Sequence, residues 1–105
     1  MEEGAPHPGQ ILREEFLRPI GWTAEMLADR LSVPPELMRD LLDERKAVTP
    51  AVALRLARLF QISANYWMEL QACYELSRTR MSDVAAIERI RPFAGEATAA
   101  ESRST

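Results

Sequence analysis

The side chains best suited to specific chemistry lie in residues 31–48, LSVPPELMRDLLDERKAV. An arginine on an exposed helix can donate two hydrogen bonds to the N7 and O6 atoms of guanine, and a carboxylate can accept one from the N4 amino group of cytosine. Both residue types are present in this segment, where Arg39 stands between Glu36 and Asp40. The charged residues of the segment are four acids and three bases: Glu36, Arg39, Asp40, Asp43, Glu44, Arg45 and Lys46. These side chains are suited to hydrogen bonding with base edges.

Catalytic and metal-binding groups are sparse in the rest of the sequence. The only histidine is His7 and the only cysteine is Cys73, so there is no Cys and His cluster to bind zinc. No nucleophile accompanies His7, and no glycine-rich phosphate loop is present. We therefore expect no cofactor, no metal and no enzymatic activity. We expect His7 to be a turn or cap residue, and Cys73 to be a small core residue.

Length and composition indicate one soluble domain. The chain has 105 residues, of which 47% are hydrophobic and 28% charged. Its apolar runs are shorter than the roughly 18 to 20 residues of a membrane span, and its N-terminus is acidic and prolyl, so we expect no membrane anchor or signal peptide. A lone cysteine suits the reducing cytoplasm. The net charge of −3 argues against a protein that coats nucleic acid without specificity.

Caps and apolar periodicity predict five helices and almost no strand. The expected helices span about residues 8–17, stopping before Pro19, then 23–31, 34–43, 49–60 and 63–78. Residues 81–93 fit either a short amphipathic helix through Val84, Ile87 and Ile90 or a brief extended piece. Residues 92–105 are small and polar, which is typical of a disordered tail.

Two of these helices, at 23–31 and 34–43, are joined by a tight turn, which is the spacing of a helix-turn-helix. The surrounding sequence, from HPGQIL through ALRLARLF to ANYWMELQACYEL, resembles the HigA family of antitoxins over about residues 7–76. That family belongs to the phage-repressor-like helix-turn-helix class. The sequence departs from it at Gln10, where Glu is usual, and at Glu36, Leu37 and Asp40, where Arg, Asn or Ser is frequent.

The resemblance implies an all-α, compact five-helix domain of lambda-repressor-like fold. It further implies a homodimer that binds a palindromic double-stranded operator in its own promoter and holds a HigB-like, mRNA-cleaving toxin inactive. We expect residues 1–91 to form the DNA-binding domain together with a C-terminal dimerisation segment, and residues 92–105 to form the tail. Alternatives are a stand-alone helix-turn-helix repressor and a toxin-neutralising module that has lost DNA binding.

Within that model, the third helix reads the bases, and the residues on either side of it contact the phosphates. Arg39 would read guanine, acids would read cytosine, and Leu37 would meet a thymine methyl group. Free N–H groups at the capped N-termini of the second and fourth helices are natural phosphate sites. The candidate DNA-contacting residues are Thr23, Pro35, Glu36, Leu37, Arg39, Asp40, Arg45, Lys46 and Thr49.

The acids of the third helix also have a purely structural interpretation. Glu36 in a first turn interacts favourably with the helix dipole, by roughly 0.3 to 1 kcal/mol. Asp40 and Asp43 would be solvated surface, with Arg39 and Asp43 forming an i, i+4 ion pair. The sequence leaves both interpretations open.

Overall fold

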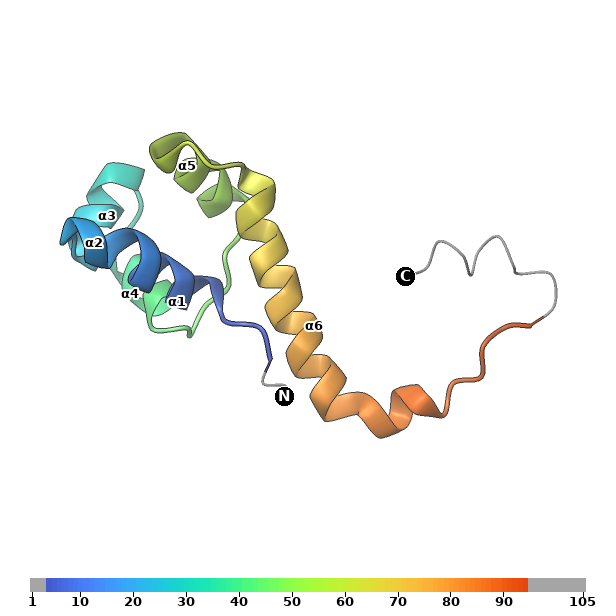
Figure 1. Ribbon diagram of the computed structural model, residues 1–105. Helices are drawn as coiled ribbons and strands as arrows, with labels where there is room; N and C mark the ends of the chain where they lie inside the picture. The colour runs from blue at the N-terminus through green and yellow to red at the C-terminus, as the bar shows by residue number, and fades with distance from the viewer. Residues whose placement is uncertain (1–3, 95–105) are drawn as a thin grey trace.

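The structure, a computed structural model, describes residues 4–94, and this part of the chain is helical with no strand. The helices fall into five segments, as predicted, because the first three short elements run on from one another (Figure 1). The elements are α1 (Pro8–Ile11), η1 (Leu12–Leu17), α2 (Arg18–Ile20), α3 (Ala24–Leu31), α4 (Pro35–Leu42), α5 (Pro50–Phe60) and α6 (Ala64–Glu88). The predicted all-α class is confirmed. Most of the predicted tail, residues 95–105, lies outside the described residues.

The first helical segment does not stop before Pro19, so that prediction is wrong. The chain enters a π-helical turn at η1, where the Arg18 N–H donates to the Arg13 carbonyl five residues earlier. Pro19 has no N–H to donate, and it follows a turn that has already left the regular i−4 pairing. The segment ends instead at Gly21, whose φ of 72° is the left-handed conformation that glycine adopts without strain.

The hydrophobic core is built from one face of each helix around Trp67, which is fully buried. Phe16 packs against it with ring centroids 5.1 Å apart, and Phe60 packs on Phe16 at the same separation. The core contains Leu12, Leu17, Leu27, Ala28, Leu31, Met38, Leu41, Leu42, Val48, Val52, Ala53, Leu56 and Trp67. The first helical segment and α5 pack directly on the first half of α6, whereas α3 and α4 pack on those two and on each other.

One buried polar contact fixes the loop between α4 and α5 to α6. The Val48 N–H donates to the Gln71 side-chain oxygen at 2.8 Å, and Gln71 is buried. A buried backbone donor without a partner costs about 1 to 3 kcal/mol, so the hydrogen bond to this glutamine stabilises the conformation in which Val48 enters the core. The loop that follows α4 is thus held at its far end.

The second half of α6 leaves the body and forms an arm (Figure 1). Residues 81–93, for which helix and extended structure were both possible, are helical as far as Glu88 and belong to the same helix as Trp67. The arm gives the described chain principal extents of 55 × 25 × 22 Å. Cys73, expected in the core, is exposed, because the face of α6 that packs on the body at this level carries Gln71 and Tyr74 instead.

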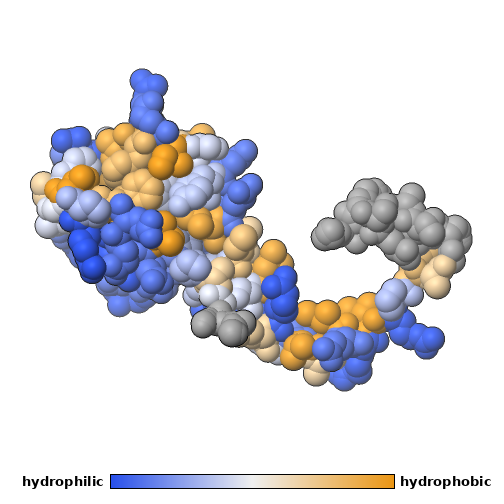
Figure 2. Space-filling view, viewed as in Figure 1, coloured by the Kyte–Doolittle hydropathy of each residue, from blue (hydrophilic) through white to orange (hydrophobic). Residues whose placement is uncertain are grey.

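Apolar side chains are exposed along this arm (Figure 2). They are Leu76, Met81, Val84, Ile87, Ile90 and Phe93, each between 46% and 70% exposed. None of the helices between residues 4 and 94 combines the length and the apolar character needed to cross a bilayer.

Candidate nucleic-acid interface

Helices α3 and α4 form the predicted helix-turn-helix. Ser32 ends α3 in the left-handed conformation, and the Val33 N–H returns to the Ala28 carbonyl at 3.1 Å, which makes the turn tight. Pro34 and Pro35 then begin α4, because proline fits the start of a helix but not its interior. The turn sets the angle at which α4 is presented.

Burial of one face of α4 leaves its charged face outward. Met38, Leu41 and Leu42 are buried, and the side chains on the other face are exposed or partly so. The outward set consists of Pro35, Glu36, Arg39, Asp40 and Asp43, of which Asp40 is half-buried. Leu37, proposed above for contact with a thymine methyl group, is half-buried and packs against the core, so it offers only part of its side chain.

The charged residues of this face are paired with one another and with α3. Arg39 donates to the Glu25 carboxylate of α3, so the expected pairing of Arg39 with Asp43 is wrong. Arg45 forms ion pairs with two acids of this face instead, at 3.2 Å from Asp40 and 3.5 Å from Asp43. The i, i+4 ion pair between Arg39 and Asp43 does not form, because Arg39 reaches Glu25 on α3 and Asp43 lies near Arg45 in the loop after α4.

The Glu25 carboxyl group is electrostatically stabilised in its charged form. A hydrogen bond from its own backbone N–H, followed by the hydrogen bond from Arg39, holds the pKa of Glu25 below its usual value of 4.5. Glu25 stands in the first turn of α3, where the helix dipole favours an acid. It is therefore ionised at neutral pH, and Arg39 keeps a charged partner.

The two flanking helix N-termini are capped as predicted. The Thr23 hydroxyl accepts from the Met26 N–H at 3.1 Å, and the Thr49 hydroxyl accepts from the Val52 N–H at 3.3 Å. Both threonines are exposed. Lys46 is also exposed, and no ion pair joins it to another residue between positions 4 and 94. These groups border α4 at positions where a phosphate backbone could approach.

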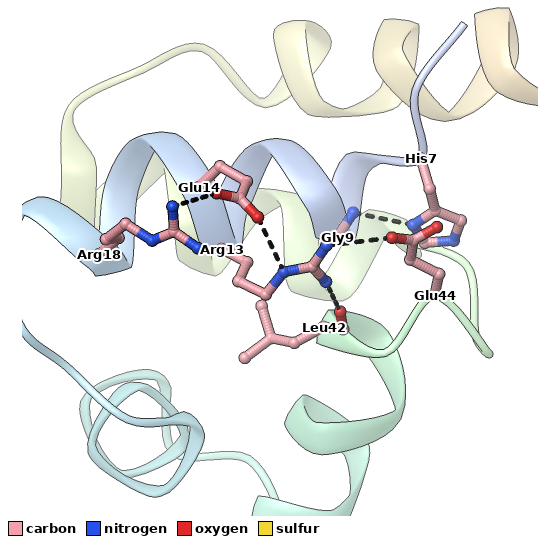
Figure 3. A network of polar contacts seen from close by, with 7 residues as sticks. All are labelled: His7, Gly9, Arg13, Glu14, Arg18, Leu42 and Glu44. Atoms are coloured by element: carbon pink, nitrogen blue, oxygen red, sulfur yellow. Dashed lines mark hydrogen bonds and ion pairs between the residues drawn. The ribbon is translucent and has the colours of Figure 1, made fainter. Parts of the chain in front are cut away.

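A polar network around Arg13 ties the end of α4 to the first helical segment (Figure 3). Arg13 donates to the Leu42 carbonyl, one of the last four carbonyls of α4, which have no partner within the helix. It also lies 3.2 Å from Glu44 and 3.4 Å from Glu14. The two ends of the contact between Arg13 and Leu42 are 29 residues apart, so local sequence patterns do not predict it.

His7 caps α1, as expected, and it is buried. Its Nδ1 atom accepts from the Gly9 N–H at 2.8 Å (Figure 3). Its ring also meets Tyr74 of α6 edge-on, with ring centroids 4.7 Å apart. A Cβ atom on Gly9 would lie 2.0 Å from the Leu41 carbonyl oxygen, so only glycine lets α1 approach α4 this closely. Burial lowers the pKa of His7 below 6.5, and this outweighs the opposing effect of Glu44.

No family model matches the chain, but curated relatives do. Virulence-associated protein I of Dichelobacter nodosus is 38% identical over 96 residues, covering 91% of this chain and 88% of the relative. Antitoxin HigA-1 of Vibrio cholerae is 31% identical over 72 residues, covering 69% and 68%. The chain belongs to the HigA family of antitoxins. The resemblance inferred from the sequence is thereby confirmed.

Solved structures of HigA-type antitoxins share the fold. The antitoxin HigA of Pseudomonas aeruginosa with the higBA promoter has a TM-score of 0.81 and 34% identity, covering 85% of this chain and 98% of that one. The antitoxin GraA in complex with its operator has a TM-score of 0.81 and 30% identity, covering 90% and 99%. Both relatives are antitoxins, one solved with promoter DNA and the other with its operator.

The lowered pKa of His7 predicts a pH-dependent stability. The unfolded chain takes up a proton as the pH falls below about 6.5 while the folded state resists it, so the free energy of unfolding should decrease with falling pH. His7→Asn keeps a capping acceptor but does not titrate. Urea unfolding at about pH 7.5 and 5.5 should show a larger loss for the wild type than for His7→Asn. Equal losses would mean that His7 does not carry this dependence.

Proposed function

We propose that this HigA-family protein is a homodimeric antitoxin that binds the operator of its own promoter and holds a small mRNA-cleaving toxin inactive. The observation that carries the proposal is the outward charged face of α4, bordered by two exposed helix N-termini and Lys46. The DNA-bound HigA and GraA structures support it, since both share this fold. Such a repressor would act in the cytoplasm, and its role would be binding rather than catalysis.

Base readout in this proposal belongs to the outward face of α4. Arg39 would donate to guanine and the exposed Glu36 would accept from cytosine. Asp40 is held by Arg45 and would read a base only once Arg45 turns to a phosphate. Pro35 and the exposed part of Leu37 would make apolar contact in the groove.

Phosphate contact belongs to the borders of the same face. The N-termini of α3 and α5, capped by Thr23 and Thr49, present free backbone N–H groups, which suit an anion. Lys46 would add a mobile positive charge, and Arg45 a second one. Affinity from these groups would offset the repulsion between the acids of α4 and DNA.

The arm of α6 is the proposed dimerisation segment. Leu76, Val84 and Ile87 line a groove of about 400 Å³ on one side of the helix, together with Thr79, Arg80 and Glu88. An isolated helical arm is marginal in water, and an apolar stripe of this kind is covered in most soluble proteins. A second copy would cover it and would place two α4 helices on successive turns of a palindromic operator, about 34 Å apart.

Operator binding tests the base-reading and phosphate-binding roles. We expect the protein to prefer its own upstream DNA over a random duplex at two salt concentrations. Arg39→Ala should relax base preference, whereas Lys46→Ala should weaken binding to all sequences alike and lower the salt slope by about one. Fluorescence anisotropy titrations measure both. Equal effects of the two substitutions would contradict the division of roles.

The dimer is tested by placing a charge in the apolar groove. Ile87→Asp should convert the dimer to a monomer at micromolar concentration, because dimer formation would remove a carboxylate from water between two largely apolar arms. Ala85→Asp adds the same charge on the opposite side of α6, about 200° around the helix from Ile87, and should leave the dimer intact. Sedimentation velocity distinguishes the two species. A wild-type protein that sediments as a monomer would refute the proposed dimer.

Toxin neutralisation is tested with the product of the adjacent open reading frame. If that product arrests growth when expressed alone, co-expression of this chain should restore growth, and the two proteins should copurify. A complex that forms without operator binding would identify a protein-interaction module that has lost DNA binding. Operator binding without any neighbouring toxin would identify a stand-alone repressor.

A further inference from the structure

We propose that Glu25 is a positioning residue for operator recognition: its carboxylate holds the Arg39 guanidinium in one orientation for base reading. The same contact also reduces the attraction of Arg39 to phosphates of any sequence. This inference rests on the proposed function, because it assigns a role within the same DNA-facing surface. Glu25 is on α3, outside the nine residues expected from the sequence to contact DNA.

The geometry of the ion pair leaves the reading edge of Arg39 available. The contact uses Nη1 of Arg39, and no other hydrogen bond or ion pair joins this guanidinium to residues 4–94. The Nε and Nη2 groups therefore remain as two parallel donors, which is the fork that fits the N7 and O6 atoms of guanine. An arginine without such a partner would sample many rotamers and would lose that freedom on binding.

The exposure of the pair argues against a role in stability. The side chains of Arg39 and Glu25 are 49% and 57% exposed, and ion pairs with this much solvent contact contribute little to folding. The pair nevertheless links the first turn of α3 to the middle of the outward face of α4. A contact that contributes little to stability but fixes a base-reading side chain is best explained by recognition.

The charge around Arg39 explains the second effect of Glu25. A groove of about 560 Å³ between the first helical segment and the helix-turn-helix has four charged lining residues, which are Arg13, Arg18, Arg39 and Asp43. Arg13 and Arg18 already share Glu14, at 3.4 and 2.8 Å. Glu25 gives Arg39 a partner as well, so the groove attracts a phosphate backbone less than three free guanidinium groups would.

The test compares Glu25→Gln with Asp29→Asn, which removes one negative charge a helical turn further along α3. Asp29 is exposed and has no ion pair with Arg39. Binding is measured to the upstream DNA, to variants of it at each base pair, and to a random duplex over a range of salt. Circular dichroism melting verifies that both variants fold like the wild type.

Glu25→Gln should reduce discrimination at the base pair read by Arg39 by about five- to tenfold. It should also strengthen binding to random duplex and steepen the salt slope by up to about 0.9, since one more positive group becomes free for a phosphate. Asp29→Asn should keep wild-type base discrimination. In an Arg39→Ala background, Glu25→Gln should leave base discrimination unchanged.

Unchanged discrimination in Glu25→Gln, with a wild type that prefers its operator, would overturn the role of Glu25 alone. A change of the same size in Asp29→Asn, or in the Arg39→Ala background, would also overturn it, because the effect would not pass through Arg39. A wild type without any operator preference would instead refute the proposed function, and this inference with it.

Discussion

Burial of one face of α4 determines what the rest of this molecule can do. Met38, Leu41 and Leu42 are held in the core, so the helix cannot rotate without exposing them. Burying side chains of this size stabilises the fold by roughly 1.5 to 3 kcal/mol each. The outward position of Arg39 follows from that packing, since helical geometry places it on the other side. The tight turn, the α1 contact at Gly9 and the Arg13 network all maintain the same orientation.

The charge balance of the surface explains how an acidic chain can carry this interface. Arg39 and Arg45 both meet carboxylates, at Glu25 and at Asp40 and Asp43. These pairs lie at the surface, with only Asp40 half-buried, and surface ion pairs contribute little to stability. The pairs instead lower the net attraction of the surface for phosphate, which weakens sequence-independent binding more than base reading. An acidic recognition helix is therefore compatible with selective binding, provided that the flanking groups supply affinity.

Local signals predicted most of the fold. The helices around Thr23 and Thr49 follow from caps, and the buried face of α4 follows from the spacing of Met38, Leu41 and Leu42. Family membership followed from short motifs around them. Contacts between distant segments were not predictable in this way. The continuation through Pro19 depends on a π-helical turn, and the partner of Arg13 lies in another helix.

In the candidate site too, local patterns predicted which side chains are exposed but not which distant residues they contact. Exposure of Glu36 and Arg39 was predictable from periodicity, but the choice of Glu25 over Asp43 as the partner of Arg39 depends on the crossing of α3 over α4. Cys73 was misplaced for a related reason. Contacts with the distant residues Val48 and His7 place Gln71 and Tyr74 on the face of α6 that meets the body, and Cys73 lies on another face.

One continuous helix, α6, connects the core that holds α4 to the arm proposed for dimerisation. Trp67 fixes the start of this helix in the core, and the same unbroken helix carries Ile87 in the arm. At about 1.5 Å of rise and 100° of rotation per residue, the position of the apolar groove is set by the core packing of the first turns. In a dimer formed through the arms, the separation of the two α4 helices would therefore depend on helix length and phase. An insertion or a proline within α6 would change that separation without touching α4, so operator spacing would be determined far from the residues that read the bases.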